Sequence, residues 1–370
     1  MTRVIVKLLK QSIDFNCTIG LLVVPESGGS TLFRDLRLKI SADDHNQEVE
    51  EMKMTKRIAV VVVLLLIGFG SVWAGGQAEQ AQETYRIGAA MYDLSNKFHT
   101  FIQDGIQRFA DERDNVEVVF VDGQAESSLQ ISQVETLISR GVDAIILVPV
   151  SNSALSMIIN QCQEAGVKLV VANLMPDEED LARVDAYVGS ESIDAGLIQA
   201  EWVAEALGGE GNVGILIGDM GLEVARMRTQ GNKDVFDRYP GIQVVRELEG
   251  RWDRGQAITI VENWLSSGIG DDLDAIVANN DEMAIGAHFA ARQVGRDDLI
   301  IAGIDATPDA LEYLGRGIDV TVFQDGLGQG YGAAELAYNL IQGRTVEKLN
   351  WIPFELVTPD LRDEYLARWE

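Results

Sequence analysis

Short apolar runs alternate with amphipathic stretches along most of the chain, from residue 85 to residue 357. The runs are rich in Val, Ile and Ala, which is typical of strands buried on both faces of a parallel sheet. The stretches 97–113 and 127–140 carry apolar residues three and four positions apart, so one face of each predicted helix packs on a sheet. We expect Ser95 or Asn96 to cap the first of these helices. The alternation predicts an α/β fold in which parallel strands are covered by helices on both faces.

The apolar runs form two series that resemble each other. Residues 86–93 (RIGAAMYD) are similar to residues 212–219 (NVGILIGD), and three further pairs follow in the same order. The offset between matched positions changes little, from 126 residues for Asp93 and Asp219 to 132 residues at the last pair. The near-constant offset predicts two copies of one doubly wound lobe. The other pairs are 116–123 with 242–250, 142–149 with 273–280 and 167–173 with 299–305.

Polar residues stand where the predicted strands end. In open α/β sheets, ligands bind outside the carboxyl ends of the parallel strands. Two lobes that face each other would therefore place both sets of polar residues around one cleft. These residues are Asp93, Asp122, Asn173, Asp219, Asn279, Asn280, Asp281 and Asp305.

The N-terminal segment is predicted to lie outside the fold. Residues 58–67 (IAVVVVLLLI) are apolar, basic residues precede them, and 68–74 (GFGSVWA) ends in small residues. This order is typical of a secretory signal peptide over 52–74, and the run is short for a membrane anchor, which needs ~20 apolar residues. Residues 1–51 are interpreted as an upstream extension that the mature protein lacks, and 75–83 as a flexible leader.

No cysteine stands at the predicted cleavage site before Gly75, so the sequence predicts no lipid anchor. We therefore expect an exported, unanchored, soluble protein of the periplasm. The chain has two cysteines and three scattered histidines, too few for a zinc cage or a disulfide framework. Its net charge of −28 disfavours binding to nucleic acids and to anionic membranes, because both are negatively charged.

Two motifs suggest metal or cofactor chemistry at first sight. Residues 177–180 (DEED) lack the alternating spacing of a calcium-binding loop and are interpreted as a solvated loop. Residues 328–333 (GQGYGA) fit the GxGxxA pattern of dinucleotide-binding sites, but no acidic residue closes a second strand about 20 residues further on. Close helix packing is the favoured interpretation of these glycines. We expect neither a metal nor a cofactor.

Four motifs carry a resemblance to a known family. They are 278–287 (ANNDEMAIGA), 302–309 (AGIDATPD), 251–257 (RWDRGQA) and 224–231 (VARMRTQG). With them, residues 84–357 resemble the periplasmic sugar-binding proteins of the ribose- and galactose/glucose-binding type. The resemblance implies two doubly wound lobes of the periplasmic binding protein type I fold, joined by a hinge of three crossings, with the ligand in the cleft. It implies a first lobe of residues 84–189 plus 325–353 and a second lobe of residues 190–324 plus 354–370.

The resemblance also implies which residues bind the ligand. Amide, carboxylate and guanidinium groups are forked and can bond two adjacent hydroxyl groups, while the C–H faces of a sugar ring lie on aromatic rings. A structural role competes at four positions: Asn280 as a helix cap, Asp305 in a turn, Arg228 in a surface ion pair and Trp252 in ordinary packing. Leu174 replaces a residue that is often basic in the family, and His99 replaces an aromatic ring. The sequence therefore does not specify which sugar binds. The implied ligand-binding residues are Asn96, Phe98, His99, Asn173, Arg228, Trp252, Asn280, Asp305 and Gln324.

By resemblance, the chain is the substrate-binding component of an ABC-type importer, which binds a monosaccharide (pentose or hexose) or a polyol such as inositol by hinge closure. Its implied partner is the membrane permease, and we expect a monomer that is not an enzyme. The same fold serves receptors for chemotaxis and signalling, so sugar sensing through a chemoreceptor is an alternative. An α/β enzyme that uses Asp93 or Asp305 as acid or base is another. A repressor with the same lobes would need a basic helix-turn-helix before Tyr85, where the chain has an apolar segment.

Overall fold

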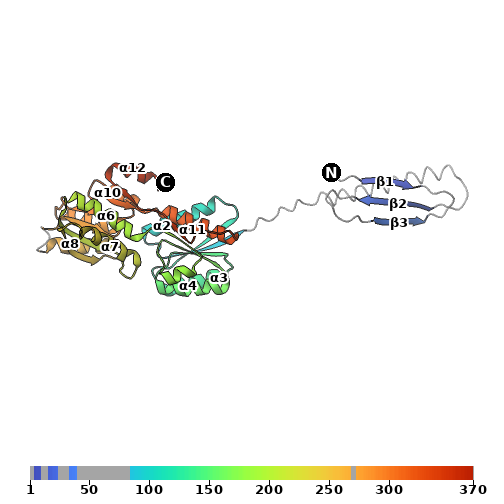
Figure 1. Cartoon of the computed structure of the whole chain (residues 1–370), viewed down its shortest axis with the longest axis horizontal. Coiled ribbons are helices and arrows are strands. Elements are labelled where there is room, and N and C mark those ends of the chain that lie inside the picture. Colours follow the sequence, from blue (N-terminus) through green and yellow to red (C-terminus); the bar gives the residue numbers. More distant parts are fainter. Residues whose placement is uncertain (1–3, 10–15, 24–32, 40–83, 268–271, 370) are drawn as a thin grey trace. The chain divides into compact units, whose positions relative to one another are not determined.

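The computed structural model describes residues 4–9, 16–23, 33–39, 84–267 and 272–369 (Figure 1). The chain divides into two compact units, residues 1–81 and residues 82–370. The first unit holds a three-stranded antiparallel sheet of β1 (Val4–Leu9), β2 (Asn16–Val23) and β3 (Phe33–Lys39), in that order. The predicted signal peptide and leader lie outside the described residues. Among the helices that the structure describes, none is long and apolar enough to cross a membrane.

The second unit contains two parallel sheets, each covered by helices on both faces (Figure 1). The first sheet has six strands in the order β14-β8-β7-β6-β4-β5, so the chain winds outward from β4 in both directions. Ala89 and Met91 pack towards α2 and α11, whereas Ala90 between them packs towards α3 and α4. The strands are β4 (Tyr85–Met91), β5 (Val116–Asp122), β6 (Ala144–Leu147), β7 (Lys168–Ala172), β8 (Ala186–Gly189) and β14 (Leu349–Trp351). The helices are α2 (Lys97–Asp111), α3 (Ser127–Ser139), α4 (Asn152–Ala165), α5 (Glu178–Arg183) and α11 (Gly326–Ile341).

The second sheet repeats this arrangement with four strands in the order β10-β9-β11-β12. Ile215 faces α6 and α7, and its neighbour Leu216 faces α8 and α9. Single bridges from Ala302 and Asp305 continue the sheet into β13, which pairs with β15 in antiparallel fashion. The strands are β9 (Glu210–Ile217), β10 (Gly241–Glu249), β11 (Ala275–Ala278), β12 (Ile300–Ala302), β13 (Thr321–Phe323) and β15 (Glu355–Val357). The helices are α6 (Ser192–Ala206), α7 (Glu223–Phe236), α8 (Arg254–Ser266), α9 (Asp281–Gln293), α10 (Pro308–Tyr313), η1 (Pro359–Leu361) and α12 (Arg362–Ala367). Two doubly wound parallel sheets confirm the predicted fold class.

The internal repeat is visible in individual hydrogen bonds. After β4, the carboxylate of Asp93 accepts a hydrogen bond of 2.8 Å from the backbone N–H of Ser95. After β9, the carboxylate of Asp219 accepts the same bond, also of 2.8 Å, from Gly221. Each carboxylate folds its own loop back into an Asx turn. The matched apolar series therefore build the same turn at the carboxyl end of the first strand of each sheet.

The predicted helix starts agree with the structure. Asn96 caps α2, because its Oδ1 accepts a hydrogen bond of 3.0 Å from the N–H of Phe98. The helix ends at Asp111, two residues before the predicted end. Gly330 of α11 serves helix packing, as predicted for the 328–333 motif, because a Cβ there would overlap the backbone of Ile102 in α2.

The prediction of a solvated loop over residues 177–180 is wrong. Asp177 caps the short helix α5 by accepting a hydrogen bond from the N–H of Asp180. Asp180 is buried and accepts hydrogen bonds from Ser156 and Arg183. The acidic run therefore begins a helix, where carboxylates compensate the positive end of the helix dipole. Among the residues that the structure describes, no cluster of His, Cys, Asp or Glu is arranged to hold a metal ion.

Candidate functional site

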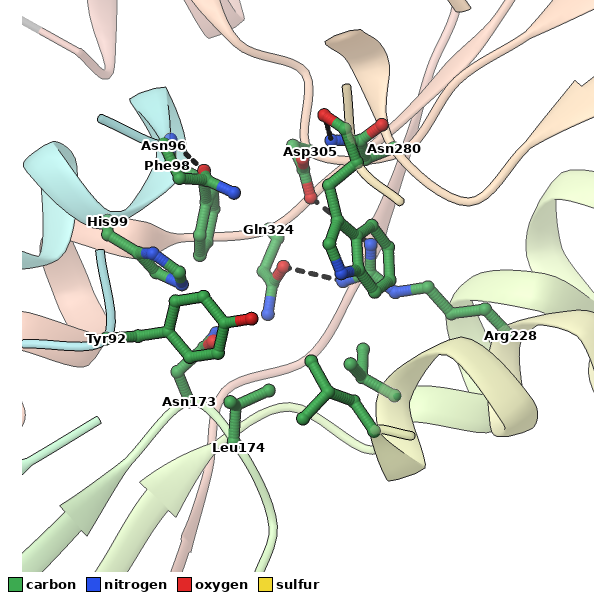
Figure 2. Close-up of a pocket in the computed structure, with 13 residues that line it drawn as sticks. Tyr92, Asn96, Phe98, His99, Asn173, Leu174, Arg228, Asn280, Asp305 and Gln324 are labelled. Carbon is green, nitrogen blue, oxygen red and sulfur yellow. Dashed lines mark hydrogen bonds and ion pairs between the residues drawn. The ribbon is translucent and has the colours of Figure 1, made fainter. Parts of the chain in front are cut away.

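A pocket lies where the carboxyl ends of the strands of both sheets meet (Figure 2). It encloses about 450 Å³ including its opening to solvent, which is within the usual range for small-molecule sites. All nine residues that the resemblance implied as ligand-binding line it, together with four others. Five of the strand-end polar residues that were also expected around the cleft do not line it: Asp93, Asp122, Asp219, Asn279 and Asp281. The lining residues are Tyr92, Asn96, Phe98, His99, Asn173, Leu174, Leu222, Val224, Arg228, Trp252, Asn280, Asp305 and Gln324.

The start of α2 places three side chains in the first wall of the pocket. Asn96 uses its Oδ1 to cap the helix, so its amide N–H₂ group is the part left to face a ligand. Phe98 and His99 follow in the first turn and are both buried. Phe98 offers an apolar ring face beside the polar amide of Asn96, a combination that suits a ligand with both C–H and hydroxyl groups.

His99 is held as a neutral ring with a defined tautomer. Its Nδ1 lies 3.0 Å from the backbone carbonyl oxygen of Asp93. A carbonyl oxygen only accepts hydrogen bonds, so Nδ1 carries the hydrogen and Nε2 is an acceptor. Burial lowers the pKa of His99, although the carbonyl and carboxylate of Asp93 act in the opposite direction. His99 therefore contributes an uncharged acceptor to the pocket, next to the ring of Tyr92 at 5.1 Å between centroids.

Asn173 stands at the end of β7 with a backbone that few residues tolerate. Its φ angle is +68°, in the left-handed region that asparagine enters more readily than most residues. Its side-chain Nδ2 donates to Oε1 of Gln329 at 2.9 Å, and Tyr187 donates its hydroxyl to the carbonyl of Asn173 at 3.0 Å. These two bonds fix the direction in which the Asn173 side chain enters the pocket (Figure 2).

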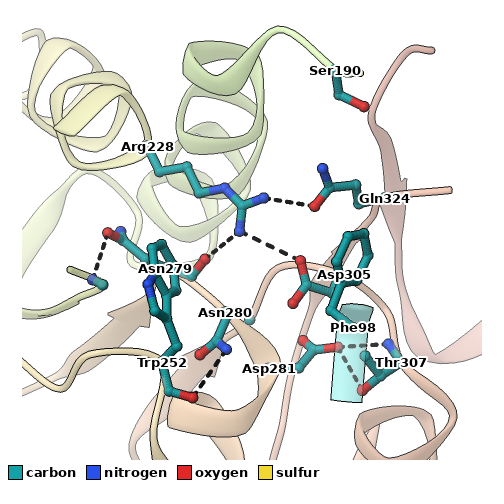
Figure 3. A network of polar contacts seen from close by, with 12 residues as sticks. Phe98, Ser190, Arg228, Trp252, Asn279, Asn280, Asp281, Asp305, Thr307 and Gln324 are labelled. Atoms are coloured by element: carbon teal, nitrogen blue, oxygen red, sulfur yellow. Dashed lines mark hydrogen bonds and ion pairs between the residues drawn. The ribbon is translucent and has the colours of Figure 1, made fainter. Parts of the chain in front are cut away.

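The second wall is organised around Arg228, which projects from α7 and is only 3% exposed (Figure 3). Its Nη1 donates to the carbonyl oxygen of Asn279 at 2.6 Å and lies 3.4 Å from Oδ1 of Asp305. Its Nη2 donates to Oε1 of Gln324 at 2.7 Å. The interpretation of Arg228 as part of a surface ion pair is therefore wrong. The guanidinium is buried, and its partners come from three different connections of the second half.

Asp305 is the acidic partner in this network and is 4% exposed. Burial raises the pKa of Asp305 to about 7, while the guanidinium of Arg228 lowers it. Asp281 lies behind it and is fully buried, where it accepts hydrogen bonds of 2.7 Å from the N–H of Thr307 and from the hydroxyl of Thr321. Burial and the charge of Asp305 raise the pKa of Asp281 well above its ordinary value. Asp281 does not line the pocket, and its bonds to Thr307 and Thr321 hold the loop after β12 in place.

Trp252 supplies the aromatic surface of the second wall. It sits in a left-handed turn with φ of +66°, and its ring packs directly against Gly218. A Cβ on residue 218 would overlap the indole, so the ring can occupy this position only because residue 218 is glycine. Asn280 ties this turn to α9: its Nδ2 lies 3.4 Å from the carbonyl oxygen of Trp252, and its Oδ1 caps the helix through the N–H of Met283. Asn280 thus caps the helix and lines the pocket at once.

Three lining residues were missed in the sequence and one was noted only as a departure from the family pattern. Leu222 and Val224 occupy the positions that match Asn96 and Phe98 at the repeat offset of 126 residues. The repeat itself was therefore the signal that could have found them. Tyr92 follows directly after β4, and its half-buried phenol has a raised pKa because of burial and the nearby carboxylate of Asp219. No motif marked it.

Together the lining groups can hold a small molecule that carries several hydroxyl groups. The amides, the carboxylate of Asp305 and the guanidinium of Arg228 offer donors and acceptors in forked pairs. The rings of Phe98 and Trp252 offer flat apolar faces. Because most of these polar groups are buried, each hydrogen bond left unmade by a poorly matched ligand costs about 1–3 kcal/mol.

Comparison with known proteins adds an independent observation. A family model described as a periplasmic binding protein domain matches residues 87–345. A putative rhizopine-binding protein of Rhizobium meliloti is 40% identical over 278 residues, covering 74% of this chain and 89% of that protein. A xylitol-binding protein of Mycolicibacterium smegmatis is 33% identical over 298 residues, covering 80% of this chain and 84% of that protein.

Comparison with solved structures points to the same family. An ABC transporter solute-binding protein of Bacillus halodurans, crystallised with bound myo-inositol, is 43% identical and superimposes with a TM-score of 0.74. The match covers 78% of this chain and 99% of that one. A periplasmic solute-binding protein of Actinobacillus succinogenes with bound D-allose is 26% identical with a TM-score of 0.71, over 76% of this chain and all of that one.

Proposed function

This chain belongs to the periplasmic binding protein family, and from that premise we propose that it is the substrate-binding component of an ABC-type importer for a monosaccharide or polyol. The observation that carries the proposal is the pocket: a buried guanidinium–carboxylate pair, amides and aromatic rings meet between two doubly wound sheets. The similarity to a protein with bound myo-inositol and to proteins named for rhizopine and xylitol binding makes a cyclic or linear polyol the first ligand to test.

We assign each wall of the pocket a share in ligand binding. Arg228, Asp305 and Gln324 bond adjacent hydroxyl groups from the second wall, and Asn280 adds its amide. Phe98 and Trp252 cover the two faces of the ligand ring. The remaining proposed ligand-binding residues are Asn96, His99 and Asn173, which present amide groups and a neutral imidazole to the outer hydroxyl groups.

Binding closes two lobes around the ligand in this proposal. The first lobe comprises residues 84–189 plus 325–353, and the second comprises 190–324 plus 354–370. The chain crosses between them at 189–191, 324–325 and 353–354, and these crossings form the hinge. Gln324 lies at one crossing, so a ligand bonded to it is held next to the axis of closure.

The ligand leaves the protein unchanged and passes to a membrane permease. Transfer of this kind requires export, which the predicted signal peptide over residues 52–74 supplies, and a monomer in the periplasm as the transported unit. Handing the closed form to a chemoreceptor remains an alternative use of the same binding event. In both uses the protein acts by binding and not by catalysis.

A thermal-shift panel of pentoses, hexoses, xylitol and myo-inositol tests the proposal on the full chain. A ligand that binds only the folded protein raises the melting temperature, by an amount that grows with its concentration over Kd. We expect at least one member to give a shift of about 3 °C or more at 1 mM. Mass spectrometry of the released ligand should show an unchanged molecule. A panel without any shift would rule out this ligand class, and a chemically altered ligand would rule out a binding role alone.

A further inference from the structure

We infer that Trp369, which does not line the pocket, is a positioning residue that holds Asp305 in its ligand-binding orientation. Trp369 follows α12 (Figure 1), and its indole Nε1–H donates a hydrogen bond of 2.8 Å to the carbonyl oxygen of Ala306. Ala306 is the residue after Asp305. The inference rests on the proposed function, because it concerns how the binding carboxylate is placed.

The backbone at Asp305 needs such support. The φ angles are +120° at Asp305 and +49° at Ala306, so two successive residues with side chains have left-handed backbone. Such conformations persist only where their surroundings fix them, and they gather at ligand sites. Two bonds hold the N–H groups: Asp305 N–H donates to the Val322 carbonyl at 2.7 Å, and Ala306 N–H donates to the Thr321 hydroxyl at 3.2 Å. The Trp369 indole holds the carbonyl side of the same turn.

The ring of Trp369 also supports the opposite wall of the pocket. It packs on Phe101 of α2 with 4.1 Å between ring centroids and on Phe323 of β13 with 5.5 Å. Phe101 stands three residues after Phe98, so the two rings are neighbours on one face of α2. Trp369 packs against the core of the first sheet and against that of the second. The Trp369 indole therefore supports a residue of each wall. It reaches Phe98 through the ring of Phe101, and it reaches Asp305 through the carbonyl oxygen of Ala306.

The position of Trp369 is itself fixed by the strand that pairs with β13. Glu355 of β15 accepts hydrogen bonds from the hydroxyl of Tyr365 at 2.7 Å and from the guanidinium of Arg368 at 2.8 Å. Tyr365 stacks edge-on against Phe323 with 5.1 Å between centroids. These contacts hold the C-terminal helix α12 against the sheet edge that carries Asp305. They also fix the position of the Trp369 indole, which follows this helix.

A purely structural role would depend on the ring, and a positioning role depends on the N–H group. Trp369→Phe separates the two, because phenylalanine keeps an aromatic ring between Phe101 and Phe323 but cannot donate to Ala306. Trp202→Phe is the matched control: Trp202 lies on α6, is partly buried and packs against the core of the second sheet. It makes the same chemical change away from the pocket.

The experiment measures two quantities on wild type and both variants. The first is Kd for myo-inositol, or for the best member of the panel, by titration calorimetry. We expect Trp369→Phe to raise Kd about threefold to tenfold, the effect of one lost hydrogen bond, and Trp202→Phe to leave it unchanged. The second is hydrogen exchange without ligand. We expect the amides of Asp305 and Ala306 to exchange at least about tenfold faster in Trp369→Phe, while core strands keep their wild-type rates.

The outcomes separate this inference from the proposed function. If wild type binds no panel member, the proposed function fails, and the exchange rates alone decide whether Trp369 fixes the turn. If Trp369→Phe matches wild type in exchange, the positioning role is overturned whatever the affinity. If exchange instead rises throughout the second sheet and the melting temperature falls, Trp369 stabilises the fold in general, which also overturns it.

Discussion

The wall that the first half contributes to the pocket carries no charged side chain, whereas the second wall carries a buried ion pair. Tyr92, Phe98 and His99 give the first wall its shape, and its histidine is kept neutral by burial. Arg228 and Asp305 give the second wall its strongest hydrogen-bonding groups. Two halves with the same topology therefore contribute different chemistry to the pocket. The first provides its shape and neutral hydrogen-bonding groups, and the second provides its charged groups.

The backbone of the two halves nevertheless shares positive φ angles at the matched positions. Asn173 and Asp305 end matched strands and both have positive φ angles. Two successive left-handed residues follow the second strand of each sheet, at 124–125 and at 251–252. The second of these residues is Ala125 in one half and Trp252 in the other. The repeat thus supplies matched backbone positions in both halves, and the chemistry of the pocket depends on which side chain stands at each position.

The comparison is tested most severely by removing the charge of the second wall. Arg228→Ala leaves the carboxylate of Asp305 buried without its partner, so we expect the free energy of unfolding to fall by about 3–5 kcal/mol. Binding of the panel ligand should weaken at least 100-fold, because two or more charge-assisted bonds of about 1.5–3 kcal/mol are lost. Chemical unfolding and calorimetry measure the two effects.

The double variant Arg228→Met/Asp305→Asn is the control for this change. It removes both charges, so we expect most of the lost stability to return while binding stays weak. Binding restored together with stability would show that the ion pair supports the fold and does not contact the ligand.

Removing the aromatic face of the second wall should have the next largest effect. Trp252→Ala takes away the ring that lies on Gly218, and we expect Kd to rise about 10- to 50-fold from lost apolar contact. The intrinsic tryptophan emission of wild type should change on ligand addition, and this change should shrink in the variant. An unaltered Kd would mean that the indole only packs on the protein.

The ion pair also predicts a pH dependence that the first wall cannot produce. Asp305 accepts ligand hydroxyl groups as a carboxylate, and burial raises its pKa to about 7. Protonation therefore competes with the ligand as the pH falls from 8 to 6, and Kd should rise about tenfold over that range. His99 has a lowered pKa and stays neutral in the same window. In Asp305→Asn the calorimetric Kd should be independent of pH, and a sloping profile in that variant would assign the titration to another group.

The smallest effect is expected from the first wall. His99→Phe keeps a ring beside Tyr92 but removes the Nε2 acceptor, so Kd should rise about threefold to tenfold, the cost of one neutral hydrogen bond. The shape of the pH profile should stay that of wild type. A loss as large as that in Arg228→Ala would erase the distinction between the two walls.

The sequence predicts the fold and the members of the site better than it predicts their contacts. Strand and helix periodicity, repeated at a nearly constant offset, specifies two doubly wound sheets and places Asn173 and Asp305 at matched strand ends. Arg228 meets Asp305 and Gln324 across 77 and 96 residues of chain. Such pairs depend on how a helix packs on its sheet, and no local pattern encodes that packing. The acidic run at 177–180 was misjudged for the same reason, because burial of Asp180 depends on Ser156 of a neighbouring helix.

Gly218, on which the Trp252 indole packs, has a consequence for ligand selectivity. Because residue 218 has no side chain, the Trp252 indole packs directly on the backbone there. A methyl group on residue 218 would overlap the indole, push it towards the opposite wall and so narrow the pocket. We expect Gly218→Ala to shift the ligand preference towards thinner or smaller molecules, without changing the identity of any residue that lines the pocket.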